Sequence, residues 1–167
     1  IGKNTMLIRP DAGSFFFIGS IFTDATIPAD LPFEADRCGT CTRCLDACPT
    51  GALVQPRLLD ATRCISYRTI EYREVFSDDV AKSLDGWAFG CDVCNDVCPW
   101  NINFAQPTDN PAYQSREDLG TDPDFFERMS EEEFSRSYAD TPMSRPGLTG
   151  MRRNWRAALS SKPEFQE

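Results

Sequence analysis

Eight cysteines are the residues of this chain whose type and spacing could do chemistry. A first motif, residues 38–49, reads C-x-x-C-x-x-C-x-x-x-C-P, the spacing with which bacterial ferredoxins hold iron–sulfur clusters. A second, shorter motif, residues 91–99, reads C-x-x-C-x-x-x-C-P, and Cys64 stands alone between the two. Eight thiols make two sets of four, which is the number of ligands that two 4Fe–4S clusters need. The cysteines therefore predict a protein with two such clusters.

The spacing also predicts how the ligands divide between the clusters. In two-cluster ferredoxins the first three cysteines of a motif hold one cluster, while the fourth ligates the other. The second motif lacks its leading cysteine, because Ala88 occupies that position, and Cys64 is expected to replace it. Since the ligands cross between motifs, loss of the clusters should unfold the middle of the chain. Cluster 1 is thus assigned Cys38, Cys41, Cys44 and Cys98, and cluster 2 is assigned Cys48, Cys64, Cys91 and Cys94.

Disulfides and zinc are the alternatives to iron–sulfur clusters. Four disulfides would suit a small secreted domain in an oxidising compartment, but no such domain requires this spacing. Zinc sites usually pair one C-x-x-C with another. The chain contains no histidine, which excludes histidine-ligated zinc and Rieske-type clusters. The motifs therefore favour 4Fe–4S clusters over both alternatives.

Length and composition predict a soluble globular protein of one domain, with 167 residues, a net charge of −9 and 41% hydrophobic residues. No apolar run approaches the roughly 20 residues of a transmembrane helix, and no signal peptide pattern is present. Together with the cluster cysteines, these features predict a cytoplasmic protein that does not enter the membrane. The chain begins with Ile1 rather than methionine, which indicates that upstream sequence is missing.

The N-terminal residues 1–24 are expected to form a β-hairpin. Residues 5–8 make a short apolar strand, and residues 11–14 supply turn chemistry. Residues 15–22 are almost continuously apolar, which is typical of a strand buried on both faces. Either residues 120–160 or a domain preceding the chain could cover this strand, and the second interpretation is favoured because so large an apolar surface is rarely left exposed.

Helices are expected on both sides of the second motif. Asp60 should cap a helix over residues 60–73, and Ser130 with Glu133 should form a capping box for a helix over 131–138. The other elements expected are a short strand within residues 49–54, helices at 78–84 and 123–129, and a helix within 142–167 whose apolar stripe is Leu148, Met151, Trp155 and Leu159.

Several segments resemble the epoxyqueuosine reductases, and the resemblance covers nearly the whole chain. It is most specific at Cys64-Ile65-Ser66 and at residues 98–101, since the ferredoxin spacing alone is generic. The family uses cobalamin and two 4Fe–4S clusters to remove the epoxide oxygen from a modified guanosine in a tRNA anticodon. The further segments that carry the resemblance are residues 1–5, 13–19, 23–24, 38–53, 64–67, 69–71, 90–97, Arg145 and residues 147–154.

The resemblance implies an α+β fold in three parts: a hairpin remnant of a cobalamin-binding domain (1–30), a ferredoxin-like double-cluster domain (31–103) and a C-terminal helical tail (104–167). The family's N-terminal domain makes most of the cobalamin pocket and supplies an acidic proton donor, which is expected upstream of Ile1. No catalytic residue is therefore assigned in this chain, which would be the electron-delivering fragment of the oxidoreductase and inactive alone. Ser66 and Asp92 are candidate cobalamin contacts, or else ordinary polar groups beside the cluster ligands.

Charge is uneven along the C-terminal part of the chain. Residues 104–141 carry ten acidic residues against three arginines, whereas residues 142–167 carry five basic residues against two acidic ones. Phosphate contacts position a protein on nucleic acid, so we expect the arginines of the second segment to contact the anticodon stem-loop. The alternative is that they pair with the neighbouring acids. The arginines in question are Arg145, Arg152, Arg153 and Arg156.

Two other functions stay open from the sequence. The first is a stand-alone ferredoxin-like electron-transfer module that serves another oxidoreductase, and the second is a protein in which the clusters are purely structural. Either redox function implies a cytosolic electron donor. The sequence indicates neither the identity of that donor nor the oligomeric state.

Overall fold

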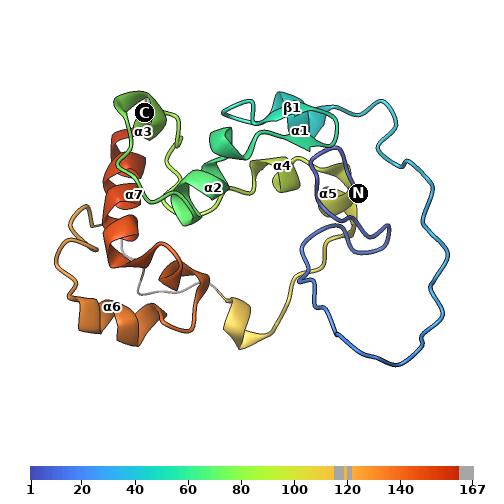
Figure 1. Cartoon of the computed structure of the whole chain (residues 1–167). Coiled ribbons are helices and arrows are strands. Elements are labelled where there is room, and N and C mark those ends of the chain that lie inside the picture. Colours follow the sequence, from blue (N-terminus) through green and yellow to red (C-terminus); the bar gives the residue numbers. More distant parts are fainter. Residues whose placement is uncertain (115–118, 120–121, 162–167) are drawn as a thin grey trace.

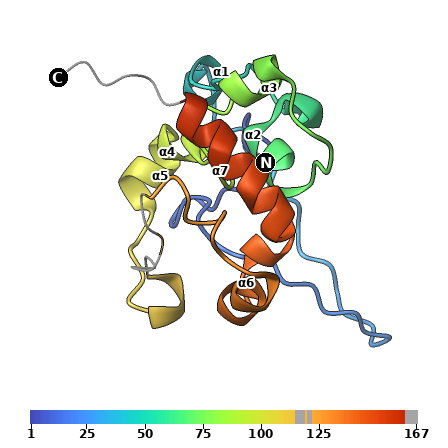
Figure 2. The ribbon, with the colours of Figure 1, turned by 90° about the vertical axis from the view of Figure 1, so that its left-hand side faces the viewer.

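The computed structural model of the chain describes residues 1–114, 119 and 122–161. Within these residues, seven α-helices, three 3-10 helices and a two-stranded sheet make a small α+β fold (Figures 1 and 2). None of the described helices has the length and apolar character that a membrane crossing requires. The predicted α+β class is therefore confirmed.

The two cysteine motifs adopt the same local fold. Two single-turn helices, α1 (Arg43–Asp46) and α4 (Val93–Asp96), each lie inside one motif and pack against each other. In both, the residue after the helix donates its backbone N–H to the first helical carbonyl. Figure 1 shows these helices beside the N-terminal loop, at the end of the molecule opposite α7. The repeated spacing in the sequence thus corresponds to a repeated turn in the structure.

The motifs diverge after their Cys-Pro pairs. The first continues into an antiparallel pair, β1 (Leu53–Gln55) and β2 (Leu58–Leu59), and β1 is the strand predicted within residues 49–54. The second continues into α5 (Pro99–Phe104), with Pro99 at the first helical position. Proline is tolerated there because the first N–H groups of a helix have no partner inside the helix.

The single helix predicted over residues 60–73 is wrong at Cys64. Asp60 does act as an N-cap, accepting the N–H of Thr62 at 3.1 Å, but it caps the short 3-10 helix η1 (Ala61–Arg63). Cys64 then takes an extended conformation (φ −70°, ψ 128°) and precedes α2 (Ile65–Ile70). Because of this break, Cys64 lies outside the helix, at the N-terminal end of α2.

The predicted N-terminal hairpin does not form. Within residues 1–24 the described pairing is one isolated bridge between Arg9 and Gly13. Thr5 has a positive φ of 67°, and Gly2 donates its N–H to the carbonyl of Met6 at 2.8 Å, so this part is a turn rather than a strand. Residues 15–22 extend away from the rest of the molecule (Figure 1). No described segment provides the backbone hydrogen bonds of a second strand there.

The long C-terminal helix packs against two shorter helices from the middle of the chain. α7 (Gly147–Ser161) is the longest and contacts both α3 (Asp78–Lys82) and α2. It crosses the face of the molecule in Figure 2. The expected helix at 78–84 is thus present as α3, capped by Ser77. Two short 3-10 helices, η2 (Pro111–Tyr113) and η3 (Pro142–Ser144), lie in the segments that connect α-helices.

The largest apolar core lies between α7 and α6 (Glu131–Tyr138). α6 begins with the predicted capping box, in which Ser130 and Glu133 each accept the other's backbone N–H. Of the predicted stripe on α7, Leu148 and Met151 are fully buried, whereas Trp155 and Leu159 are half-buried. The other buried members of this core are Phe126, Phe134 and Tyr138.

The helix predicted at residues 123–129 is wrong, because this segment forms successive turns. Side chains of α7 bind backbone carbonyls of this segment. Arg152 donates to the carbonyls of Phe126 (3.1 Å) and Met129 (2.8 Å), and Trp155 Nε1 donates to that of Asp122 (3.1 Å). These long-range hydrogen bonds hold the turns against α7.

Candidate metal centre

The first cavity has a volume of about 360 Å³ and lies between the first motif, α5 and the N-terminal loop. Its lining contains all four cysteines that the spacing assigns to cluster 1: Cys38, Cys41, Cys44 and Cys98. Three come from the first motif, and the fourth is the N-cap of α5. The structure thus brings the crossed fourth cysteine to the cavity of the first motif.

The second cavity, of about 350 Å³, lies between β1, α2 and α4. Ser66 and Asp92, the candidate cobalamin contacts, also line it. Ser66 donates its hydroxyl proton to the carbonyl of Cys91 at 3.3 Å, and Asp92 accepts from the side chain of Asn95 at 3.1 Å. The cysteines in this lining are the four assigned to cluster 2: Cys48, Cys64, Cys91 and Cys94.

All eight cysteines are free thiols. In the described part of the chain, no three side chains of the metal-binding types converge in a way that would hold a single ion. Each set of four surrounds a cavity instead. That arrangement suits a cubane, because the four thiolates of a 4Fe–4S cluster bind four different irons.

Burial and mutual proximity oppose ionisation of the thiols in the metal-free chain. Burial, followed by the nearby thiols of Cys91 and Cys64, raises the pKa of Cys94 to about 12. Burial is also the largest cause of the raised pKa of Cys44 and of Cys91. Positive iron is the charge that would compensate four buried thiolates, so binding of a cluster should release protons.

Cys48 differs from the other buried thiols. Burial alone would raise its pKa, but the backbone N–H groups of Leu53 and Ala52 and the hydroxyl of Thr50 outweigh that cause and lower the pKa. The N–H of Ala52 donates to Cys48 Sγ at 3.3 Å. Hydrogen bonds to a sulfur ligand are one of the means by which a protein tunes the potential of an iron–sulfur cluster.

α2 holds two ligands of the second cavity in place. Cys64 is its N-cap, and the fully buried Thr69 accepts the N–H of Gly90, the residue before Cys91, on its hydroxyl oxygen at 3.0 Å. The carbonyl of Thr69 accepts from the amide of Asn154 on α7 at 2.6 Å. A continuous set of hydrogen bonds therefore joins α7 through α2 to the loop that carries Cys91.

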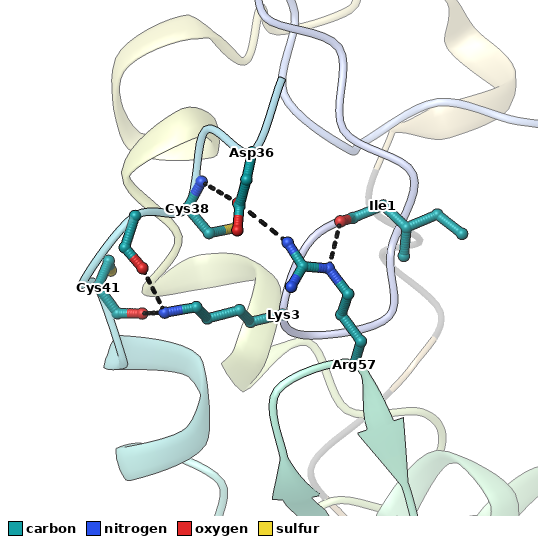
Figure 3. Close-up of polar contacts among 7 residues, drawn as sticks. Ile1, Lys3, Asp36, Cys38, Cys41 and Arg57 are labelled. Atoms are coloured by element: carbon teal, nitrogen blue, oxygen red, sulfur yellow. Dashed lines mark hydrogen bonds and ion pairs between the residues drawn. The ribbon is translucent and has the colours of Figure 1, made fainter. Parts of the chain in front are cut away.

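The N-terminal loop supports the first cavity (Figure 3). Lys3 Nζ donates to the carbonyls of Gly39 (2.6 Å) and Cys41 (2.9 Å). Asp36 accepts the N–H of Cys38 at 3.0 Å and forms an ion pair with Arg57 at 2.9 Å. These contacts fix the start of the first motif against residues that are distant in sequence.

Asn4 lies between the two cavities. It is 2% exposed, and it is the one described residue that appears in both linings. Its amide donates to the carbonyl of Cys94 at 3.2 Å. The cysteine spacing gives no indication of Lys3, Asn4 or Thr69, because each acts through the folded backbone. The available signal was the family resemblance of residues 1–5 and 69–71.

The four arginines proposed to contact tRNA all have partners within the chain. Arg145 pairs with Glu71, and Arg156 pairs with Glu127 at 2.7 Å; both arginine side chains are largely exposed. Arg152 caps carbonyls of the turns at 126–129, as described above. Arg153 donates to the carbonyls of Tyr72, Glu74 and Arg68, and its guanidinium lies over the ring of Phe76.

Comparison with known proteins agrees with this site. Residues 37–101 match the family described as the 4Fe-4S double cluster binding domain. Fold and site together therefore define a double 4Fe–4S cluster-binding protein. The matched residues include every cysteine of the chain.

The particular family is indicated by relatives that match well beyond the cysteines. An epoxyqueuosine reductase of Xanthomonas campestris is 45% identical over 169 residues, covering 100% of this chain and 47% of that protein. A solved epoxyqueuosine reductase of Bacillus subtilis gives a TM-score of 0.86 at 33% identity, and one solved with an epoxyqueuosine-modified tRNA-Tyr stem loop gives 0.80 at 31%. Each alignment covers 96% of this chain and 42% of the solved chain.

Over nearly its whole length the chain is a homologue of the epoxyqueuosine reductases. It spans about half the length of the curated relatives it matches.

Proposed function

We propose that this chain is the electron-delivering part of an epoxyqueuosine reductase, an oxidoreductase that converts epoxyqueuosine to queuosine in tRNA. The observation that carries the proposal is the pair of cavities, each lined by one complete set of four cysteines. Two clusters held side by side form a path for electrons from the surface to a cofactor. The similarity to epoxyqueuosine reductases supplies the reaction that this path would serve.

The proposed division of the chain has three parts. The ferredoxin-like double-cluster part is assigned to residues 31–103, and the C-terminal helical part, whose helix α7 contacts α2, is assigned to residues 104–167. Residues 1–30 belong with a cobalamin-binding domain. Their exposed apolar side chains support this assignment, since Phe17, Ile21 and Phe22 are each more than 80% exposed and need a covering surface.

Cobalamin is the cofactor that we assign to the surface beside the second cavity, which itself would hold cluster 2. Ser66 and Asp92 suit a contact with cobalamin, because their polar side chains border the cysteines there and neither forms an ion pair. When bound, cobalamin would supply the low-potential cobalt that attacks the epoxide. In this chain Ser66 and Asp92 would bind and orient the cofactor, and the second set of cysteines would hold the cluster next to it.

The anticodon stem-loop of tRNA is the proposed partner of the arginines near α7. Arg145 and Arg156 fit this role better than Arg152 and Arg153, since their guanidinium groups lie at the surface. An exposed ion pair contributes little to stability, so both could exchange a carboxylate for a phosphate.

A cytosolic carrier would provide the electrons, and the proposed location of the protein is therefore the cytoplasm.

A chimera tests the proposed function. The part of the Xanthomonas campestris enzyme that this chain does not match would be joined to residues 1–167 and loaded with iron, sulfide and cobalamin. We expect it to convert epoxyqueuosine in tRNA, and the same chimera with Cys64→Ser to lose turnover. The unmodified Xanthomonas campestris enzyme serves as the positive control.

The chimera also separates the second candidate function. If the clusters of the chimera are loaded and accept electrons, but epoxyqueuosine tRNA is not converted, the proposal is wrong. The chain would then be an electron-transfer module for another oxidoreductase. That function needs only the two cysteine-lined cavities.

A further inference from the structure

The surroundings of the first cavity are cationic, although the chain as a whole carries a net charge of −9. Among the residues that the structure describes, three basic ones, Lys3, Arg37 and Arg43, line the cavity together with the cysteines, and no acidic one does. Arg37 and Arg43 are exposed. Within the described residues neither forms an ion pair, whereas Arg9, Arg57 and Arg145 elsewhere do. The lining of the cavity therefore carries a net positive charge.

The second cavity has the opposite character. Its only charged lining residue is Asp92, among the described residues, and it contains no cation. The two cavities have similar volumes and equal numbers of cysteines, so the difference lies in what surrounds them. An anionic macromolecule would be attracted to the first cavity rather than to the second.

Aromatic side chains border the same cationic opening. Trp100 and Phe104 stack with ring centroids 5.5 Å apart, and Phe104 remains 40% exposed. Aromatic residues and arginine are the types enriched where proteins associate. Of the nearby carboxylates, Asp36 pairs with Arg57, whereas Asp46 accepts a hydrogen bond from the hydroxyl of Thr42 at 2.7 Å, which supplies no compensating charge.

We propose that the cationic opening of the first cavity, made by Lys3, Arg37 and Arg43 with Trp100 and Phe104, is the docking surface for an acidic one-electron carrier protein. The inference rests on the proposed function and adds where the electron donor docks and what charge it carries. One electron would leave the reduced carrier and one would enter the cluster held by the first set of cysteines, with no bond made or broken. Asn4 lies in the wall shared with the second set of cysteines, which would hold the next acceptor.

Nucleic acid is the other anion that could bind here, but two features favour a carrier. The cations surround the ligands of a redox centre, where close approach determines the rate of electron transfer. Redox partners also associate through small, transient surfaces. Away from the first cavity, Arg43 lies beside Asp46 and Asp96. The attraction for an anionic partner is therefore confined to the opening of the cavity.

The test mixes the cluster-loaded chain with a reduced acidic flavodoxin in a stopped-flow instrument at low salt. The bleaching of cluster absorbance measures the rate of electron transfer. In the variant Arg37→Glu/Arg43→Glu we expect the second-order rate constant to fall by about tenfold or more, within the range of electrostatic steering. High salt should remove most of the difference. The control variant Lys82→Glu/Arg136→Glu has the same net charge, with both changes at exposed positions away from the cavity.

Photoreduction by a small neutral deazaflavin should be equal in all three proteins, which shows that the clusters are intact. Equal flavodoxin rates in the two charge-reversed variants would overturn the proposal. So would a loss of tRNA binding by Arg37→Glu/Arg43→Glu with unchanged flavodoxin rates, because the surface would then bind nucleic acid. Neither outcome bears on epoxide reduction, since the chimera described above tests turnover separately.

Discussion

The cavity beside Cys38 and the cavity beside Cys64 each gather four cysteines, yet they are built differently. The first is assembled from a continuous motif and one distant cysteine, and cations surround it. The second draws its cysteines from three segments, and its position depends on α2 and α7. A repeated motif can therefore supply two similar centres, while the chain outside the motif gives each centre its own support and surface.

Removal of Cys64 should have the largest effect. Cys64→Ser takes one of four ligands from the second set only, so we expect iron to fall from about eight to about four per chain, with the first cluster retained. Anaerobic iron analysis and EPR after reduction measure this. The matched variant Cys38→Ser should lose the other cluster, and a Cys64→Ser protein with full iron and unchanged spectra would show that the ligand assignment is wrong.

Loss of the Thr69 hydroxyl should affect the two clusters unequally. Thr69→Val keeps the volume but leaves the N–H of Gly90 without its acceptor, which should cost about 1–3 kcal/mol. We expect the EPR signal and midpoint potential of cluster 2 to change while those of cluster 1 stay constant. Thr69→Ser retains the hydroxyl and should restore both. Equal changes in both clusters would show that Thr69 supports the fold in general and not the loop of Cys91.

Arg153 should behave as a structural residue rather than a tRNA contact. Its guanidinium binds one backbone carbonyl in α2 and two beyond the end of that helix, and hydrogen bonds to a charged group contribute roughly 1.5–3 kcal/mol. Arg153→Ala should therefore lower the thermal midpoint of unfolding and loosen cluster 2. Because lysine cannot reproduce the planar fork, Arg153→Lys should rescue little. An unchanged midpoint in Arg153→Ala would contradict this account.

Arg145 and Arg156 should have the smallest effect on the clusters and a measurable one on tRNA. In the chimera, Arg145→Ala/Arg156→Ala should weaken binding of the anticodon stem-loop and flatten its salt dependence by about one unit of slope per lost contact. Iron content should stay constant. Arg136→Ala, an exposed arginine on α6, is the control. An unaltered salt slope would leave both arginines as partners of Glu71 and Glu127 only.

Local features of the sequence predicted local features of the structure. The capping box of Ser130 and Glu133 and the N-cap at Asp60 depend on residues within three positions, so they could be recognised directly. The cysteine spacing is local too. It predicted two groupings, and the structure places each group around one cavity, including the recruited Cys64.

Features that depend on distant partners could not be predicted in the same way. Residues 15–22 have the composition of a buried strand, but a strand also needs a neighbour to pair with, and the described chain provides none. The turns at residues 123–129 are held by Arg152, which is distant in sequence and binds their carbonyls. Lys3 and Arg37 meet at the first cavity only after folding, so no spacing could have joined them.

The central claim is that each cysteine-lined cavity holds one 4Fe–4S cluster. Iron and acid-labile sulfide, measured on protein purified without oxygen and combined with Mössbauer spectroscopy, test it most directly. The account predicts about eight irons and about eight sulfides per chain, divided between two cubane environments. A chain that contains zinc in place of iron, or no metal and four disulfides, would contradict it.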